Sequence, residues 1–232
     1  MSQESSSFAY ASALDLLSAI KTRAVSPVEV MQDCLSRVRQ LELLLNCFVT
    51  ATPEAVLHAA RQAERAIIAG EPIGALHDIP VPVKDLITVS GVRQTFGSRT
   101  LANNMAGTDA PSVEHIKAAG ACIIGKTTTT EFGCKGGDHS PLGGITLNPW
   151  DLSKTPGGSS LGAASSVASG LTPFALSTDG GGSIRLPSSF CCLFGIKVQF
   201  GWVPVYPISA TPLLRTWARL HAQCKMRHFC SE

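Results

Sequence analysis

The sequence is poor in charged and aromatic residues, and these shortages exclude several classes of protein. Only 16% of its 232 residues are charged, 6% are aromatic, and the net charge is +2. No basic run interleaves with aromatic residues, so we expect no nucleic-acid partner. No apolar run is long enough to cross a bilayer, so we expect no membrane span. The chain also lacks an Asn-x-Ser/Thr glycosylation site.

The N-terminus and the cysteines bear on the cellular compartment. Residues 1–8 are polar and lack the apolar region of a signal peptide. The eight cysteines are scattered along the chain: Cys34, Cys47, Cys122, Cys134, Cys191, Cys192, Cys224 and Cys230. We therefore expect reduced thiols and a cytoplasmic location.

Glycine and serine are concentrated between Thr155 and Ser189. The segment 157–160 reads Gly-Gly-Ser-Ser, and the segment 179–185 reads Asp-Gly-Gly-Gly-Ser-Ile-Arg. Glycine adopts positive φ freely and leaves backbone N–H groups open to a ligand. Three glycines directly before a serine therefore predict an oxyanion-binding turn, built from Gly180, Gly181 and Gly182.

A nucleophilic serine needs a base, and no histidine lies between Ser140 and Leu220. A lysine can replace the histidine. Lys84 is the best candidate because it follows the apolar segment 79–83, which would carry it into the interior. Desolvation there favours the neutral amine that a base requires.

Together these motifs resemble the amidase signature family, whose members hydrolyse amides with a Ser-Ser-Lys triad. The resemblance covers residues 11 to about 207, and 75 positions separate Lys84 from Ser159 and 24 separate Ser159 from Ser183, as in the family. It implies that Ser183 is the nucleophile, that Ser159 is a bridging serine after a non-proline cis peptide bond, and that Lys84 is the general base. It also implies a small-molecule amide substrate, no metal and no organic cofactor.

The alternation of helix and strand patterns predicts an α/β fold. The resemblance implies a mixed β-sheet core flanked by helices on both sides, truncated at its C-terminus. We expect helices at 11–23, 26–41, 53–69, 112–119 and 161–170, and strands at 79–83, 121–124 and 172–177. Pro80 and Pro82 favour an edge strand or an irregular ladder.

The chain divides into three expected regions. Residues 1–70 form an N-terminal helical segment, residues 71–207 an incomplete amidase signature core, and residues 208–232 an aberrant tail. Back-translation of residues 215–230 in another frame permits a family-like continuation, so we expect the tail to be read out of frame. In that case His221, Cys224, His228 and Cys230 are accidental and bind no metal.

Several residues have a second interpretation. Residues 120–127 fit the phosphate-loop pattern G-x4-G-K-T, but their apolar interior indicates a buried strand. Lys84 could pair with Asp85, and Ser160 could join the triad or cap the next helix. We expect Asp179 and Arg185 to hydrogen-bond the turn. Departures from the family pattern include Leu161 and Cys192, each in place of a glycine.

Amide hydrolysis through an acyl-enzyme is thus the expected function. The first alternative is the amidase-like subunit of a tRNA-dependent amidotransferase, although that subunit usually has Thr where Gly180 stands. An alternative of another class is a non-catalytic remnant that only binds. A homodimer is the assembly to test.

Overall fold

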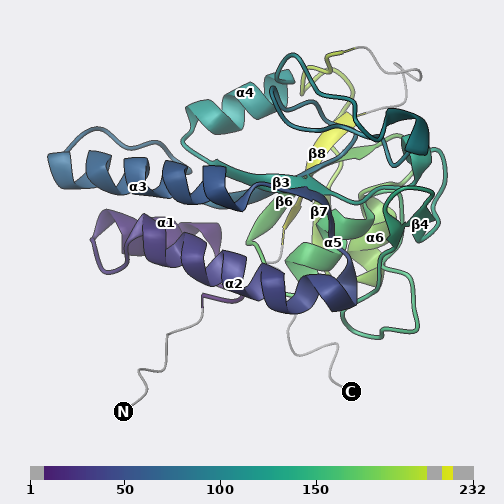
Figure 1. The fold of residues 1–232 in the computed structure, drawn as a ribbon, viewed down its shortest axis with the longest axis horizontal. Coiled ribbons are helices and arrows are strands. Elements are labelled where there is room, and N and C mark those ends of the chain that lie inside the picture. The colour runs from purple at the N-terminus through teal and green to yellow at the C-terminus, as the bar shows by residue number, and fades with distance from the viewer. Residues whose placement is uncertain (1–7, 208–215, 222–232) are drawn as a thin grey trace.

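A six-stranded sheet forms the centre of the computed structural model, which describes residues 8–207 and the strand at 216–221 (Figure 1). The order across the sheet is β1-β3-β2-β6-β8-β7. The bounds are β1 (Phe48–Ala51), β2 (Pro80–Lys84), β3 (Cys122–Thr127), β6 (Phe174–Asp179), β7 (Phe194–Ile196) and β8 (Thr216–His221). β2 runs parallel to β3 and β6, and the other pairings are antiparallel. A separate ribbon consists of β4 (His139–Ser140) and β5 (Gly144–Ile145).

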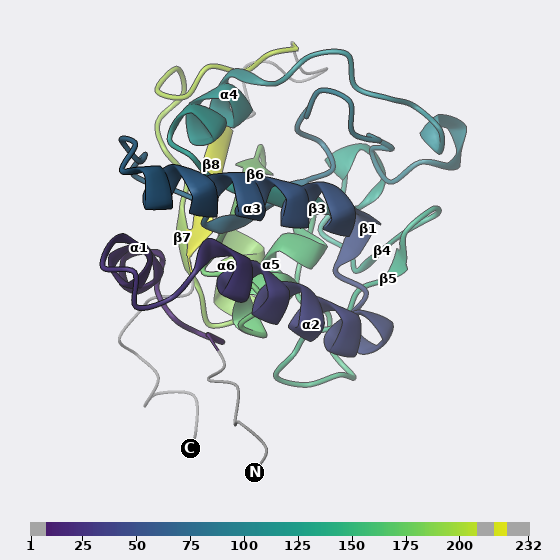
Figure 2. The ribbon, with the colours of Figure 1, turned by 60° about the vertical axis from the view of Figure 1, so that its left-hand side comes forward.

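Helices lie on both sides of this sheet, as Figures 1 and 2 show, which confirms the expected mixed α/β fold. They are α1 (Ala13–Lys21), α2 (Pro27–Leu45), α3 (Pro53–Ala69), α4 (Pro111–Ala118), α5 (Leu161–Ala168) and α6 (Arg185–Phe190). Two short 3-10 turns, η1 (Arg99–Leu101) and η2 (Glu131–Gly133), lie in the loops. No helix in the described part of the chain has the length and apolar character to span a membrane.

Local signals in the sequence account for most helix ends. Ser26 and Glu29 form the capping box that begins α2, and Gly70 ends α3 with a left-handed φ of 73°. α2 continues to Leu45, beyond the predicted end near Leu41. The reason is Asn46, which provides a left-handed C-cap with φ 53°.

The two faces of the sheet pack against different helices. Val83 and Leu176 lie in one apolar cluster with residues of α1 and α4. Ala175, the neighbour of Leu176 on β6, lies in another cluster with residues of α5. Successive strand residues point to opposite faces, so α4 and α5 cover opposite sides of the sheet. α5 is buried along its whole length, which its small side chains permit.

β2 is a central strand, so the expectation of an edge strand from Pro80 and Pro82 is wrong. It lies between β3 and β6. The expected irregular ladder is present, because the register with β3 shifts between Val81 and Pro82. Pairing with β6 is limited to the single position Val83↔Leu176, which leaves little demand for the backbone donors that proline lacks.

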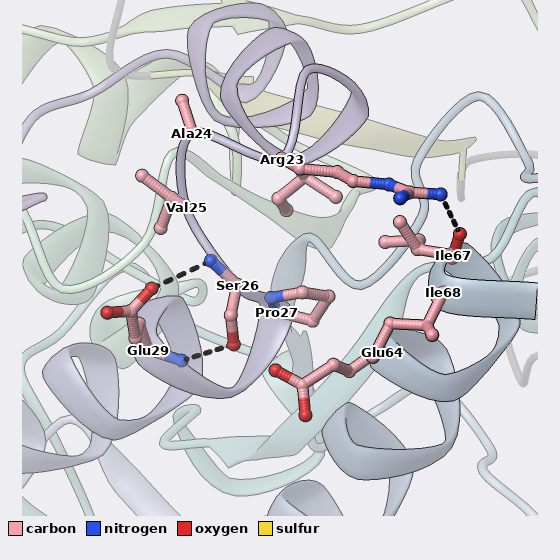
Figure 3. A pocket seen from close by; sticks show the side chains of 10 residues that line it. Arg23, Ala24, Val25, Ser26, Pro27, Glu29, Glu64, Ile67 and Ile68 are labelled. Carbon is pink, nitrogen blue, oxygen red and sulfur yellow. Dashed lines mark hydrogen bonds between the residues drawn. The ribbon is translucent and has the colours of Figure 1, made fainter.

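A cavity of about 200 Å³ lies among α1, α2 and α3 (Figure 3). Its polar groups serve local structure. Arg23 donates to the carbonyl of Ile67 at 2.8 Å, and the Glu29 carboxylate accepts from the N–H of Ser26 at 2.8 Å. None of the predicted site residues lines this cavity.

The division into 1–70, 71–207 and 208–232 stays a prediction. β1 comes from the first region and pairs with β3 from the second. Within the tail, 208–215 and 222–232 lie outside the described residues, and 216–221 are described as the strand β8. The nucleotide sequence of the gene would test the expected change of frame. Cys224, His228, Cys230 and the side chain of His221 lie outside what the structure describes.

Candidate active site

Lys84 ends β2 and is completely buried. Its Nζ donates to Ser159 Oγ and to Ser160 Oγ, each at 2.8 Å, and to the carbonyl of Thr178 at 3.5 Å. The Lys84 ammonium is therefore surrounded by neutral oxygen acceptors, on the face of the sheet that α5 covers.

Ser159 and Ser160 immediately precede α5. The Gly158–Ser159 peptide bond is cis, as the resemblance implied. Gly158 packs so closely that an added Cβ would lie 2.5 Å from the carbonyl oxygen of Gly137. Only glycine fits at that position, and its close approach fixes the backbone that presents Ser159.

Ser183 lies in the turn between β6 and α6. Ser159 Oγ donates to Ser183 Oγ at 2.9 Å. A continuous chain of hydrogen bonds therefore joins Lys84 to Ser183 through Ser159. Ser159 is 1% exposed and Lys84 is fully buried, whereas Ser183 is partly exposed, so Ser183 is the end that solvent can reach.

Asp179 and Arg185 hold the turn that carries Ser183, which confirms their expected structural part. The Asp179 carboxylate accepts from the N–H groups of Gly182, Ile184 and Arg185 at 2.8, 3.2 and 3.3 Å. The Arg185 guanidinium adds two hydrogen bonds at 3.0 Å. Burial disfavours the carboxylate, but the Arg185 and backbone donors outweigh burial and lower the pKa of Asp179 to about 2.

The same contacts correct one prediction for the oxyanion turn. The N–H of Gly182 is engaged with the Asp179 carboxylate and is therefore not an open donor. Gly181 is exposed and Gly180 partly exposed, and they lie directly before Gly182 and Ser183. In the described part of the chain, no hydrogen bond uses the N–H of Gly180, Gly181 or Ser183.

The contacts of Ser160 distinguish between its two expected parts, a hydrogen bond within the triad and a cap on the next helix. It is the N-cap residue of α5 by position, but its side chain makes no capping hydrogen bond. Its hydroxyl accepts from Lys84 instead. The carbonyl of Thr178 was not anticipated as a Lys84 acceptor, because it depends on the pairing of β2 with β6 and has no side-chain signal.

The phosphate-loop pattern at 120–127 belongs to a buried strand, as its apolar interior predicted. Lys126 lies in β3 and is 0% exposed. Its ammonium donates to the carbonyl of Ile87 at 2.6 Å. No group of three or more His, Cys, Asp or Glu side chains suited to a metal occurs among the described residues.

Three comparisons with known proteins all find similarity to amidases and related proteins. The sequence model of the family described as Amidase matches residues 29–218. One glutamyl-tRNA(Gln) amidotransferase subunit, from Symbiobacterium thermophilum, is 41% identical over 187 residues, which make up 80% of this chain and 38% of that protein. An acylamidase of Rhodococcus erythropolis is 38% identical over 193 residues, or 83% of this chain and 40% of that protein.

Solved structures show the same relationship. The crystal structure of a bacterial aryl acylamidase of the amidase signature enzymes matches with a TM-score of 0.88 and 29% identity, over 93% of this chain and 45% of that chain. The peptide amidase of Stenotrophomonas maltophilia matches with a TM-score of 0.84 and 28% identity, over 93% of this chain and 46% of that chain. The chain thus spans about 40% of the length of the curated relatives that it matches.

Proposed function

The chain belongs to the amidase family, and from that membership we propose that it transfers the acyl group of a carboxylic amide to Ser183. The observation that carries the proposal is the chain of hydrogen bonds from Lys84 Nζ through Ser159 Oγ to Ser183 Oγ, with links of 2.8 and 2.9 Å. In this proposal Ser183 is the nucleophile, Ser159 the proton relay and Lys84 the general base.

The direction of the hydrogen bonds decides when the site is active. With Lys84 protonated, the donors run outward from Lys84 to Ser159 and from Ser159 to Ser183. A hydroxyl can donate or accept, so the chain reverses when Lys84 is neutral. Ser183 then donates to Ser159, and Ser159 donates to Lys84. Burial of Lys84 supports this, because desolvation favours the neutral amine.

The proposed reaction has two stages. Ser183 Oγ attacks the amide carbonyl carbon while its proton passes to Ser159 and the proton of Ser159 passes to Lys84. The proton returns through Ser159 to the leaving nitrogen, the C–N bond breaks, and an amine departs. A water molecule then gives its proton to the relay and attacks the ester carbonyl carbon on Ser183. The ester C–O bond breaks, the carboxylic acid leaves, and the proton returns from Lys84 through Ser159 to Ser183 Oγ.

The proposed oxyanion donors are the N–H groups of Gly180, Gly181 and Ser183. Gly182 has a different part, because its hydrogen bond to Asp179 shapes the turn that aims them. A preorganised donor of this kind contributes on the order of 3 kcal/mol at the transition state.

The substrate class and location are parts of the same proposal. A small-molecule amide is the expected partner, since the net charge of +2 gives no support for a nucleic acid. The cysteines in the described part of the chain are all free thiols, which supports the cytoplasm. A homodimer stays a prediction.

A second candidate is the function of the matched amidotransferase subunit. The 41% identity to the Symbiobacterium thermophilum protein favours it. The two candidates differ in what they need. An amidase acts on an acyl arylamide by itself, whereas an amidotransferase component is expected to act only together with its partner subunits.

A covalent serine probe tests the proposal. The chain is treated with a probe that carries an activated acyl or phosphonyl group, and the modified residue is located by mass spectrometry. We expect labelling at Ser183 and its loss in Ser183→Ala. Ser189→Ala is the matched control, because Ser189 is an exposed serine of α6 outside the hydrogen-bonded chain. Unchanged labelling or arylamide turnover in Ser183→Ala would show that the nucleophile is another residue.

A further inference from the structure

Asp85, which directly follows Lys84 in the sequence, forms a completely buried ion pair with Lys126 of β3. Lys126 Nζ lies 3.5 Å from Asp85 Oδ1, and both side chains are 0% exposed. Lys126 is the lysine of the phosphate-loop pattern, and neither that pattern nor the proposed reaction explains its burial. A charge in the interior is costly unless it is paired, so this pair calls for a physical explanation.

One carboxylate oxygen of Asp85 is surrounded by hydrogen-bond donors. Its Oδ2 accepts from the N–H and the hydroxyl of Thr95 at 3.0 and 2.5 Å, and from the N–H of Gly97 at 3.4 Å. Hydrogen bonds of this kind stabilise a carboxylate. Asp85 Oδ1 makes no hydrogen bond within the described residues, and the ammonium of Lys126 is its ion-pair partner. Lys126 is therefore the cation that balances Asp85.

The pair lies behind the active site. Val83 and Lys84 are successive residues of β2 and point to opposite faces of the sheet. Lys126 is the register partner of Val83 and donates to the carbonyl of Ile87, and Val83 and Ile87 belong to one apolar cluster. The N–H of Ile87 in turn donates to the carbonyl of Lys84 at 2.9 Å. Lys126 thus holds the turn from Lys84 to Ile87 from the face opposite Ser159.

We propose that Lys126 is a positioning residue that fixes this turn and neutralises Asp85, so that Lys84 can work as a neutral amine. The inference rests on the proposed role of Lys84 as the base. Removal of the Lys126 charge leaves an uncompensated carboxylate beside Lys84. That negative charge stabilises the Lys84 ammonium and keeps the base protonated at higher pH.

Among the side chains that the structure describes, the other charges around Lys84 are paired. The charged side chains on the strands and helices next to it are Asp85 after β2, Lys126 on β3, Asp179 on β6 and Arg185 on α6, and α5 contributes none. Asp179 and Arg185 pair with each other at 3.0 Å. Burial lowers the pKa of Lys126 to about 8 against the attraction of Asp85.

Titration of Lys84 in the full chain tests the inference without requiring turnover. Lysine labelled with ¹³C at Cε gives one NMR signal for each lysine, and loss of a signal in Lys84→Met identifies Lys84. We expect Lys126→Met to raise the pKa of Lys84 by on the order of one unit. Asp85→Asn combined with Lys126→Met removes both charges and should return the pKa toward the wild-type value. Lys154→Met, at an exposed lysine, is the matched control and should leave it unchanged.

If Lys126 had only a structural role, Lys126→Met would lower thermal stability without these changes in the pKa of Lys84. An unshifted pKa of Lys84 in Lys126→Met, or a shift that persists in the double variant, overturns the inference. If Lys126→Met does not fold, Asp85→Asn alone decides. That variant leaves the Lys126 ammonium unpaired, so a lowered pKa of Lys84 supports the inference, and an unchanged or raised one overturns it. Failure of Ser183 to accept an acyl group would overturn the proposed function, and it is measured separately.

Discussion

At the scale of single residues, the protonation of Lys84 controls the proposed chemistry. A protonated Lys84 donates to Ser159 and cannot accept its proton. We expect Lys84→Ala to lower the rate of acyl transfer about 10²–10⁴-fold, the usual contribution of a general base. The wild-type rate should fall as the pH drops through the pKa of Lys84, because the ammonium form then predominates. The measurement is kcat/KM for an acyl arylamide against pH.

The control for that series is Lys154→Ala, which removes an exposed lysine from a turn. It should leave the pH–rate profile in place. A wild-type profile that stays flat from mildly acid to alkaline pH would contradict a neutral lysine base, whatever the effect of the Lys84 substitution.

Cys192 is a second residue with a consequence of its own. It stands where the family pattern has glycine, and its φ is 53°, in the left-handed region. A residue with a Cβ is strained there by about 1–2 kcal/mol, and glycine is not. Glycine also gains entropy in the unfolded chain, and this offsets part of the relieved strain. We therefore expect Cys192→Gly to stabilise the fold by about 0.5–1 kcal/mol.

Chemical denaturation of the wild type and of Cys192→Gly would measure this difference. Cys192 is exposed, so the substitution removes no core contact. Cys192→Ala is the control, since it removes the thiol and keeps the Cβ. A Gly variant that is less stable than the Ala variant by about 0.4–1 kcal/mol, the entropy cost of glycine, would show that the backbone is not strained at this position.

At the scale of elements, α5 packs so closely on the neighbouring backbone that it leaves no room for a side chain at Gly162. An added Cβ at Gly162 would lie 1.9 Å from the carbonyl oxygen of Cys47 and 2.5 Å from Thr128 Oγ1. The helix would have to move away, and Ser159 and Ser160 precede it directly. We expect Gly162→Ala to cost at least about 1–3 kcal/mol of stability, as overpacking does, and to weaken labelling of Ser183.

Thermal melting and probe labelling of Gly162→Ala would be compared with Gly107→Ala. Gly107 is exposed and an added Cβ there meets no atom within 4 Å, so the control isolates the effect of crowding. Unaltered melting of Gly162→Ala would mean that α5 has more room than these distances show.

Elements marked by their own residues were predictable, and elements set by distant contacts were not. The capping box at Ser26 and the terminal Gly70 are local signals, so α2 began and α3 ended where expected. β1 was not anticipated, because its four residues become a strand only by pairing with β3, more than seventy positions away. Pro80 and Pro82 suggested an edge because proline lacks a donor, and only the sparse pairing with β6 explains their central place.

The candidate site follows the same division. Glycine and serine motifs pointed to Ser159 and Ser183, and one apolar segment pointed to Lys84. The engagement of Gly182 by Asp179 depends on how the turn folds back, and the link from Lys126 to Asp85 depends on the register of β2 and β3. The residue types show which chemical groups are present, and the tertiary structure determines which of those groups already have a hydrogen-bond or ion-pair partner.

At the scale of the whole molecule, an apolar surface lies on α6 and β7. Its side chains are 43–48% exposed: Leu186, Phe190, Phe194 and Ile196. β7 is also the last strand in the order of the six-stranded sheet, and an uncovered apolar edge strand promotes association.

We therefore expect the 232-residue chain to self-associate and to bind a dye that reports exposed apolar surface. Ile196→Lys places a charge on the edge strand and should reduce both effects, since a lysine there opposes strand-to-strand pairing. Leu43→Lys is the matched control, because Leu43 on α2 is 97% exposed but lies in neither β7 nor α6. Light scattering over a range of concentrations gives the mass. A wild-type chain that stays monomeric and melts sharply would contradict the prediction, and an equal effect of both lysines would shift its cause from this edge to net charge.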